Sequence, residues 1–349
     1  MKRDRSAPSA LAAISSEPVL DTTGPRETIG FFLTPNFSMI AFTSAIEPLR
    51  LANRVSRREL YAWRLFSADG APVRASNGVE INVQGAHRQA NGLTAAVVCA
   101  GLEVHRIDHL ELIRALRRLA SFGSALGAVC TGTYVLAKAG LLDDYQSTIH
   151  WENRDGLVAE FPYLEVSPEL FELDRNRFTC AGGTAAVDMM LSIIARDHGP
   201  DIASEVTDQL IHHRIREASE RQRMDLRSRL GVAHPKLLSV VALMEQTIET
   251  PLACDALARH VQISVRQLER LFAKYLGQSP TRYYVALRLQ RARVLLQQTS
   301  EPILGIALAA GFVSASHFSK SYHEHFGRTP SAERASRRIA RPLEHEATE

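Results

Sequence analysis

The sequence has no long apolar run and few cysteines. No run approaches the roughly 20 apolar residues that a membrane-spanning helix needs. The cysteines form no Cys-x-x-Cys pair, which argues against a zinc site and against a disulfide framework. They are Cys99, Cys130, Cys180 and Cys254. We therefore expect a cytoplasmic protein with no membrane contact that holds no metal and no cofactor.

The amino-terminal residues lack the apolar region of a secretory signal. Residues 10–14 form a weakly apolar patch, whereas a signal needs about 7 to 15 such residues. Pro8, Pro18 and Pro25 interrupt this segment, together with several serines. The composition predicts a disordered leader over residues 1–25.

Acidic and basic residues are divided unevenly along the chain. Residues 1–212 hold 20 Lys and Arg against 25 Asp and Glu, a balance of −5, and residues 213–349 hold 21 against 13, a balance of +8. A basic second part is typical of proteins that bind a polyanion, although a surface that serves solubility alone gives the same count. The length of 349 residues indicates two domains.

Short β-type runs alternate with helical patterns from residue 28 onward. Five apolar runs predict strands: Thr28–Leu33, Ala62–Ser67, Val79–Val83, Ala95–Cys99 and Ala125–Val129. Apolar residues at helical spacing predict helices over Phe42–Val55 and His109–Ser121. Buried strands that alternate with helices indicate a parallel sheet with helices on both faces. We therefore expect a flavodoxin-like α/β domain over residues 26–211.

The strand signals stop after Asp201. Before that point, further helices are predicted at Thr133–Ala139, Glu152–Glu160 and Ala185–His198, and a hairpin turn at Arg175-Asn176. A charge-dense segment then predicts a partly helical linker over residues 212–234. An all-α domain is expected over residues 235–340 and a tail over residues 341–349.

A helix with one apolar and one polar face is predicted to begin at Ser264. Ser264 is an N-cap candidate, Gln267 has the spacing of a capping box, and Gly277 can end the helix. The apolar face consists of Leu268, Leu271, Phe272 and Tyr275. The opposite face carries groups suited to base edges and phosphates, namely Arg266, Gln267, Glu269, Arg270 and Lys274.

The same layout returns later in the chain. Ser314 is predicted to cap a second helix with Phe318, Tyr322 and Phe326 inward and Ser316, His317, Ser319 and Lys320 outward. Between the two units, residues 281–297 suit a central helix with surface arginines at Arg282, Arg288, Arg291 and Arg293. The second domain is thus predicted to contain two helix-turn-helix units.

Motifs in this region resemble the AraC/XylS family of transcription regulators. They are RQLERLF from Arg266, GQSP from Gly277, Ile306-Ala307 with Gly311-Phe312, and FGRTP from Phe326. The resemblance implies promoter DNA and RNA polymerase as partners, and a homodimer. It places base-reading positions at Arg266, Glu269 and Arg270 in the first helix and at Ala315, Ser316, Ser319 and Lys320 in the second. Ala315 is too short for a polar base contact, so the second helix is expected to contribute more phosphate contacts.

The predicted strand at residues 125–129 ends in Cys130, and Thr131-Gly132 and a helix follow. A thiol at such an elbow lies near a helix N-terminus, which stabilises a thiolate. The run GAVCTG from Gly127 resembles the PfpI-like branch of the class I glutamine amidotransferase superfamily. That domain ahead of an AraC-type module is the arrangement of GlxA-type regulators. Other segments similar to that group are Glu47–Asn53, Gly140–Asp143, Thr148–Trp151 and Cys180–Gly183.

A ligand pocket is expected at the carboxyl ends of the strands. Its candidate lining residues are Asn36, Phe37, Glu47, Cys130, Thr131, His150 and Trp151. GlxA-type regulators include members that respond to arginine, carnitine and glycine betaine, so the resemblance implies a small nitrogenous effector. Trp151 or Phe37 could face a quaternary ammonium group and Glu47 could offset its charge, although aromatic residues are more often part of a core.

Catalysis by Cys130 would need a correctly placed base. His150 is a candidate, but hydrolytic relatives place a histidine directly after the cysteine, where this chain has Thr131, and Ala128 replaces the first glycine of the elbow. We therefore expect no catalytic residue and no enzyme, but a transcription activator. Two alternatives stay open. One is a cysteine-dependent amidase or peptidase with a DNA-binding module, and the other is a redox sensor in which Cys130 is oxidised.

Overall fold

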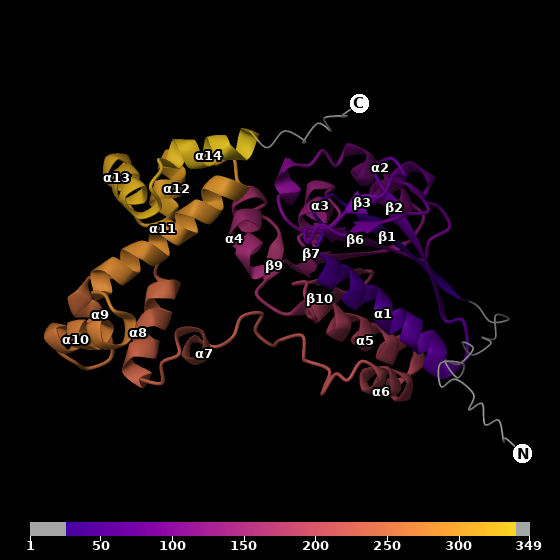
Figure 1. Ribbon diagram of the computed structural model, residues 1–349, viewed down its shortest axis with the longest axis horizontal. Helices are drawn as coiled ribbons and strands as arrows, with labels where there is room; N and C mark the ends of the chain where they lie inside the picture. Colours follow the sequence, from indigo (N-terminus) through magenta and orange to yellow (C-terminus); the bar gives the residue numbers. More distant parts are fainter. Residues whose placement is uncertain (1–25, 340–349) are drawn as a thin grey trace, which may run out of the picture.

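A computed structural model describes residues 26–339. The predicted leader and the predicted tail lie outside the described residues. Figure 1 shows an α/β domain beside a helical domain, with α4 (Trp151–Glu160) of the first next to α11 (Pro280–Gln298) of the second. No helix in the described part of the chain is long and apolar enough to cross a membrane.

The first domain is built on a seven-stranded sheet in the order β10-β11-β7-β6-β1-β2-β5. All neighbouring strands are parallel except β10 and β11, which form an antiparallel edge hairpin. The strands are β1 (Glu27–Leu33), β2 (Tyr61–Ser67), β5 (Gly85–Ala86), β6 (Ala95–Ala100), β7 (Ala125–Cys130), β10 (Phe171–Asp174) and β11 (Arg177–Cys180). Two small sheets pair β3 (Val73–Arg74) with β4 (Glu80–Ile81), and β8 (Gln146–Thr148) with β9 (Glu165–Ser167).

Helices cover both faces of this sheet, which confirms the predicted α/β fold. On one face α1 (Met39–Ser56) and α5 (Ala185–His198) pack side by side with α6 (Pro200–Gln209), and on the other lie α2 (Leu110–Ser121) and α3 (Gly132–Lys138) (Figure 1). Every residue of β6 is buried, as a strand covered on both faces requires. A Cβ at Gly127 of β7 would lie 2.0 Å from the Phe178 ring of β11, so the central strands need small residues.

The structure differs from the predicted elements in several places. The expected strand Val79–Val83 is reduced to β4, which lies outside the main sheet, because Val79 is 50% exposed and its side chain does not enter the core. The helix α6 and the short strands β3, β5, β8 and β9 were not predicted. The hairpin turn at Arg175-Asn176 is confirmed, with Asp174 opposite Arg177.

The second domain is entirely helical. Its helices are α7 (Leu226–Leu230), α8 (Pro235–Gln246), α9 (Cys254–His260), α10 (Val265–Leu276), α11, α12 (Ile303–Ala309), α13 (Ala315–Phe326) and α14 (Pro330–Ile339). One core forms around Leu268 and Phe272 and joins α8, α9, α10 and the start of α11. A second forms around Phe318 and Tyr322 and joins the end of α11 to α12 and α13. Two helix-turn-helix units therefore share one long helix.

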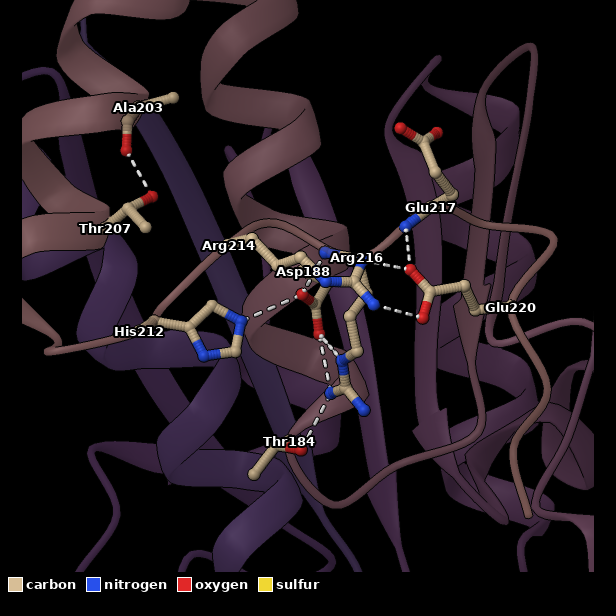
Figure 2. A network of polar contacts seen from close by, with 9 residues as sticks. All are labelled: Thr184, Asp188, Ala203, Thr207, His212, Arg214, Arg216, Glu217 and Glu220. Atoms are coloured by element: carbon tan, nitrogen blue, oxygen red, sulfur yellow. Dashed lines mark hydrogen bonds and ion pairs between the residues drawn. The ribbon is translucent and has the colours of Figure 1, made fainter. Parts of the chain in front are cut away.

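The first part of the predicted linker packs against the α/β domain. Asp188 of α5 is fully buried, and its carboxylate accepts hydrogen bonds from the Arg216 backbone N at 2.7 Å and from Arg216 Nε and Nη2 at 3.0 and 2.7 Å. His212 Nε2 lies 2.9 Å from the same carboxylate, and Arg216 Nη2 also donates to Thr184 (Figure 2). A buried carboxylate is stable only when it is paired and hydrogen-bonded in this way. The chain is thus fixed to the first domain well beyond α6.

Candidate DNA-binding surface and ligand site

The helix α10 presents a polar face that is free of ion pairs. Ser264 and Gln267 form the predicted capping box, and Gly277 ends the helix with a φ of 69°. Leu268 and Phe272 are buried in the first core. Arg266, Glu269, Arg270 and Lys274 are exposed. Within residues 26–339 no ion pair is formed by Arg266 or Arg270, so both guanidinium groups are available to an external partner.

Two residues of this helix depart from the expected pattern. Gln267 Oε1 accepts a hydrogen bond from the Ser264 backbone N at 2.9 Å, so its amide oxygen is already used by the cap. Tyr275, expected on the apolar face, is 38% exposed, and its ring packs against His234 with Lys274 over it at 5.0 Å from the centroid. Of the residues expected to contact bases, the exposed charged groups are the ones that the helix cap leaves free.

The helix α13 presents a smaller and less charged polar face. Ser314 caps it by accepting from the His317 backbone N at 3.3 Å. Ala315, Ser316, His317 and Lys320 are exposed, and Ser319 is partly buried. Lys320 lies 4.0 Å from Glu324, with both side chains mostly exposed, so this pair holds Lys320 weakly.

Arginines of α11 contact the second unit and the first domain instead of lying free on the surface. Arg288 donates to the carbonyl oxygens of Ala310 and Gly311 at 2.9 and 2.7 Å and stacks over Phe312. Arg293 lies 3.4 Å from the buried carboxylate of Glu333. The expectation of four surface arginines on this helix is wrong for these two and for Arg291; Arg282 alone is exposed. Arg288 and Arg293 thus connect α11 to the other helices of the second unit through their charged groups.

The elbow of the first domain lies where β7 ends. Cys130 has a left-handed φ of 58°, and a Cβ on Gly182 opposite would lie 2.6 Å from the Cys130 Cβ, so only glycine fits there. Burial above all raises the pKa of the Cys130 thiol to about 11; the hydrogen bond of the Thr131 backbone lowers it, the charge of Glu152 raises it, and burial outweighs the lowering. The thiol is therefore protonated at neutral pH, contrary to the thiolate that an elbow position favours.

No base is positioned to activate this thiol within the part of the chain that the structure describes. His150 is the N-cap of α4, its Nδ1 accepting from the Glu152 backbone N at 3.4 Å, and burial lowers the pKa of its imidazole. No hydrogen bond joins His150 to Cys130. The charge that acts on the thiol belongs to Glu152, which was not among the predicted pocket residues. The only sequence signal for its role was its position two residues after His150.

The predicted pocket residues fall into separate groups. Thr131 Oγ1 donates to the Gly101 carbonyl oxygen at 2.7 Å, and Phe37 forms a backbone bridge with Gly101, so the Asn36-Phe37 loop and the elbow meet at the strand ends. The Phe37 side chain is wholly buried in the core. Glu47 lies on α1, half-exposed, and pairs with Arg50 at 2.6 Å. His150 and Trp151 begin α4, with their rings 5.6 Å apart.

The helix α4 also contacts the second domain directly. Asp155 forms an ion pair with Arg291 of α11, and Gln298 Nε2 donates to the Glu152 carbonyl oxygen at 3.1 Å. A Cβ at Gly156 would lie 2.6 Å from Gln298 Oε1, so the two helices touch closely there. Ala159 packs against the second core. The helix α4 thus begins near the elbow of the first domain and contacts α11, the central helix of the second domain.

A cavity of about 490 Å³ lies between the two domains. Its walls come from α4, from Pro168 and Glu169, from residues between 219 and 229, and from α8. Trp151 is 39% exposed, and the Arg223 guanidinium carbon lies 4.2 Å from its ring centroid. Arg229 and Glu245 form an ion pair of 2.6 Å in the same wall. Sequence reasoning did not find this cavity, because its walls come from four segments that are separate in the sequence.

Comparison with known proteins covers both domains. Residues 28–196 match the model of the DJ-1/PfpI family, and residues 257–336 match that of a helix-turn-helix domain. The HTH-type transcriptional regulator GbdR of Pseudomonas aeruginosa is 46% identical over 91% of this chain and 86% of that protein. The regulator GlxA of Rhizobium meliloti is 38% identical over 88% of this chain and 95% of that protein. The crystal structure of an AraC family transcriptional regulator from Pseudomonas putida has 34% identity and a TM-score of 0.50, over 53% of this chain and 99% of that one.

Proposed function

Since the chain belongs to the GlxA-type family of transcriptional regulators, which join a DJ-1/PfpI domain to an AraC-type helix-turn-helix domain, we propose that it activates transcription in response to a small nitrogenous metabolite. In this proposal a cytoplasmic dimer binds promoter DNA and contacts RNA polymerase. The metabolite binds the first domain and shifts the population of DNA-binding states. The class of metabolite follows from the resemblance to regulators that respond to arginine, carnitine and glycine betaine.

The observation that carries the proposal is the polar face of α10. Arg266 and Arg270 are exposed and form no ion pair within residues 26–339, which suits them to the two acceptors of a guanine or to phosphates. The capping box and the buried Leu268 and Phe272 fix the helix beneath them. This combination of a fixed helix and unpaired exposed cations favours DNA recognition.

The contact between the domains supports the ligand-responsive part of the proposal. The first residues of α4 lie at the elbow side, and Asp155 further along it pairs with Arg291. A ligand that contacts the start of α4 therefore acts on a helix that already contacts the DNA-binding domain. A ligand shifts the equilibrium only if it binds one arrangement of the domains more tightly than the other.

The enzymatic and redox alternatives have less support. The pKa of Cys130 is raised to about 11, and the described residues supply no base at hydrogen-bonding distance. Nucleophilic catalysis and oxidation both proceed through the thiolate, so a protonated thiol is unsuited to either. We therefore assign no reaction to this cysteine.

The test is selection of binding sites by the full chain from a random duplex pool, followed by fluorescence anisotropy with and without L-arginine, carnitine and glycine betaine. We expect a sequence preference of at least about 10³ over random DNA and a change in affinity with one of these compounds. Transcription with purified RNA polymerase should rise when that compound is added. Absence of any sequence preference would refute the proposal, and a fall in transcription would refute the activator part alone.

A further inference from the structure

An arginine of the chain itself rests on the exposed aromatic ring of the interdomain cavity. The Arg223 guanidinium carbon lies 4.2 Å from the Trp151 ring centroid, which is the placement of a cation–π contact. Arg223 belongs to the segment 219–225, which crosses between the domains along the cavity wall and which we call the strap. The ring therefore already holds an organic cation that the chain supplies.

The strap is anchored directly beside Arg223. Gln222 Nε2 donates to Thr148 Oγ1, to the Ile149 carbonyl oxygen and to the Glu169 carbonyl oxygen at 3.0, 3.0 and 2.7 Å. Glu169 and Arg221 also form a backbone bridge. These contacts hold the backbone of the strap in place, whereas Arg223 is held by its ring contact and is itself exposed. The side chain can leave the ring without unfolding the strap.

Two buried acceptors beside the cavity lack donors. Glu169 Oε2 and Gln222 Oε1 are both inaccessible to solvent and have no hydrogen-bond partner among residues 26–339. Both residues line the cavity. A buried acceptor without a donor is unfavourable, and a ligand with N–H groups relieves that penalty once the side chains that cover the two oxygens have moved aside. The cavity of about 490 Å³ lies in the size range of small-molecule sites, roughly 300 to 1,000 Å³.

We propose that this cavity binds an organic cation with N–H donors, a guanidinium or a protonated amine, which replaces Arg223 on the Trp151 ring and donates to Glu169 and Gln222. The inference rests on the proposed function and adds where the cationic group of the effector binds and what it displaces. The ring, the free carboxylate oxygen and the free amide oxygen together match such a cation. A quaternary ammonium group could use the ring but has no N–H to offer the two acceptors.

Occupation of the cavity acts on the DNA-binding domain because both domains form its walls. Trp151 and Arg154 belong to α4, and Glu245 and Gln246 belong to α8. A ligand between them stabilises the domain arrangement in which both walls contact it. Displacement of Arg223 at the same time removes its contact with the start of α4, while Gln222 keeps the strap anchored.

The experiment uses the full chain with its two tryptophans, Trp63 and Trp151. In the Trp63→Phe protein, Trp151 is the only tryptophan and is excited selectively at wavelengths where the tyrosines do not absorb. We expect L-arginine to change its emission saturably and tetramethylammonium, at matched ionic strength, to bind at least tenfold more weakly. Emission that does not respond to L-arginine, or equal binding of both cations, overturns the proposal.

Removal of the internal cation separates displacement from simple binding. In Trp63→Phe, Arg223→Gln should bind L-arginine about twofold to fivefold more tightly, because the competing cation–π contact is worth about 0.5–1 kcal/mol. Arg227→Gln, an exposed arginine of α7 outside the cavity wall, is the matched control and should leave the affinity unchanged. Glu169→Gln should weaken binding, with a thermal melt to check that the variant folds. Unchanged affinity in Arg223→Gln overturns displacement.

This result is separable from the outcome for the proposed function. If a metabolite alters DNA affinity while Trp151 emission and the Arg223→Gln variant show no effect, the cavity inference fails and the regulator stands. If Trp151 responds as expected but the chain shows no DNA sequence preference, the site stands and the proposed function fails.

Discussion

Asp155 in α4 forms an ion pair with Arg291 in α11, and this contact joins the two domains through a pair of side chains that are both mostly shielded from water. Their exposed fractions are 31% and 25%. Arg291 Nε is buried without a partner among the described residues, so the guanidinium depends on Asp155 for its principal contact. A single ion pair that can be removed by substitution is therefore central to the contact between the domains.

Asp155→Asn should loosen this attachment by about 1–2 kcal/mol, since hydrogen bonds to charged groups are worth about 1.5–3 kcal/mol and the asparagine keeps part of the contact. Hydrogen–deuterium exchange of the amides in residues 151–160 and 285–298 should become faster. Glu249→Gln is the matched control, because Glu249 is 68% exposed and lies 3.7 Å from Arg291. Equal exchange in both variants would show that the ion pair does not hold the domains together.

The buried carboxylate of Asp188 should be essential to the attachment of residues 212–216 to the first domain. Asp188→Asn removes the charge that His212 and Arg216 face, and breaking a buried pair costs about 3–5 kcal/mol. Chemical denaturation should show this loss of unfolding free energy. Glu220→Gln, which breaks the exposed pair with Arg214 in the same segment, should cause no measurable loss. Similar losses for both variants would contradict the role given to burial.

The sequence was sufficient for features that depend on neighbouring residues. The capping box at Ser264 and Gln267, the buried Leu268 and Phe272 and the αL glycine at Gly277 all follow from spacing within one helix. The parallel sheet followed from its apolar runs for the same reason. Glu47 was expected to offset the charge of an ammonium group, whereas in the structure it pairs with Arg50 one turn along the same helix.

Features that depend on distant segments were beyond sequence reasoning. Arg288, Arg291 and Arg293 have the spacing of an exposed helix face, yet their partners come from α12, α4 and α14. The interdomain cavity is formed by four such segments. The pKa of Cys130 depends on burial, which no local pattern reports, so its elbow position suggested the wrong protonation state.

Cys130 should react slowly with thiol reagents at neutral pH. With a pKa of about 11, only about one molecule in 3,000 carries the thiolate at pH 7.5, against about one in ten for a free cysteine. The rate of modification by iodoacetamide should therefore rise about tenfold for each pH unit up to about pH 10. Mass spectrometry of the modified peptide assigns the site, and Cys130→Ser is the control. Fast modification at pH 7, or a rate that levels off near pH 8, would show an activated thiolate and restore the enzymatic and redox alternatives.

Arg270→Ala should weaken binding to the selected DNA site by about 1–3 kcal/mol, the value of a bidentate contact between arginine and guanine, while affinity for random DNA changes much less. The loss is expected because Arg270 is exposed on α10 and forms no ion pair within residues 26–339. Arg259→Ala is the matched control, since Arg259 is an exposed arginine of α9 that already pairs with Asp255 at 3.0 Å.

Anisotropy titrations at several salt concentrations distinguish a base contact of Arg270 from a phosphate contact. A base contact relaxes sequence preference at one position, whereas loss of a phosphate contact weakens all sequences alike and reduces the salt slope by about one. If Arg270→Ala weakens specific and random DNA equally, Arg270 binds phosphate, and Arg266 becomes the candidate base reader of α10.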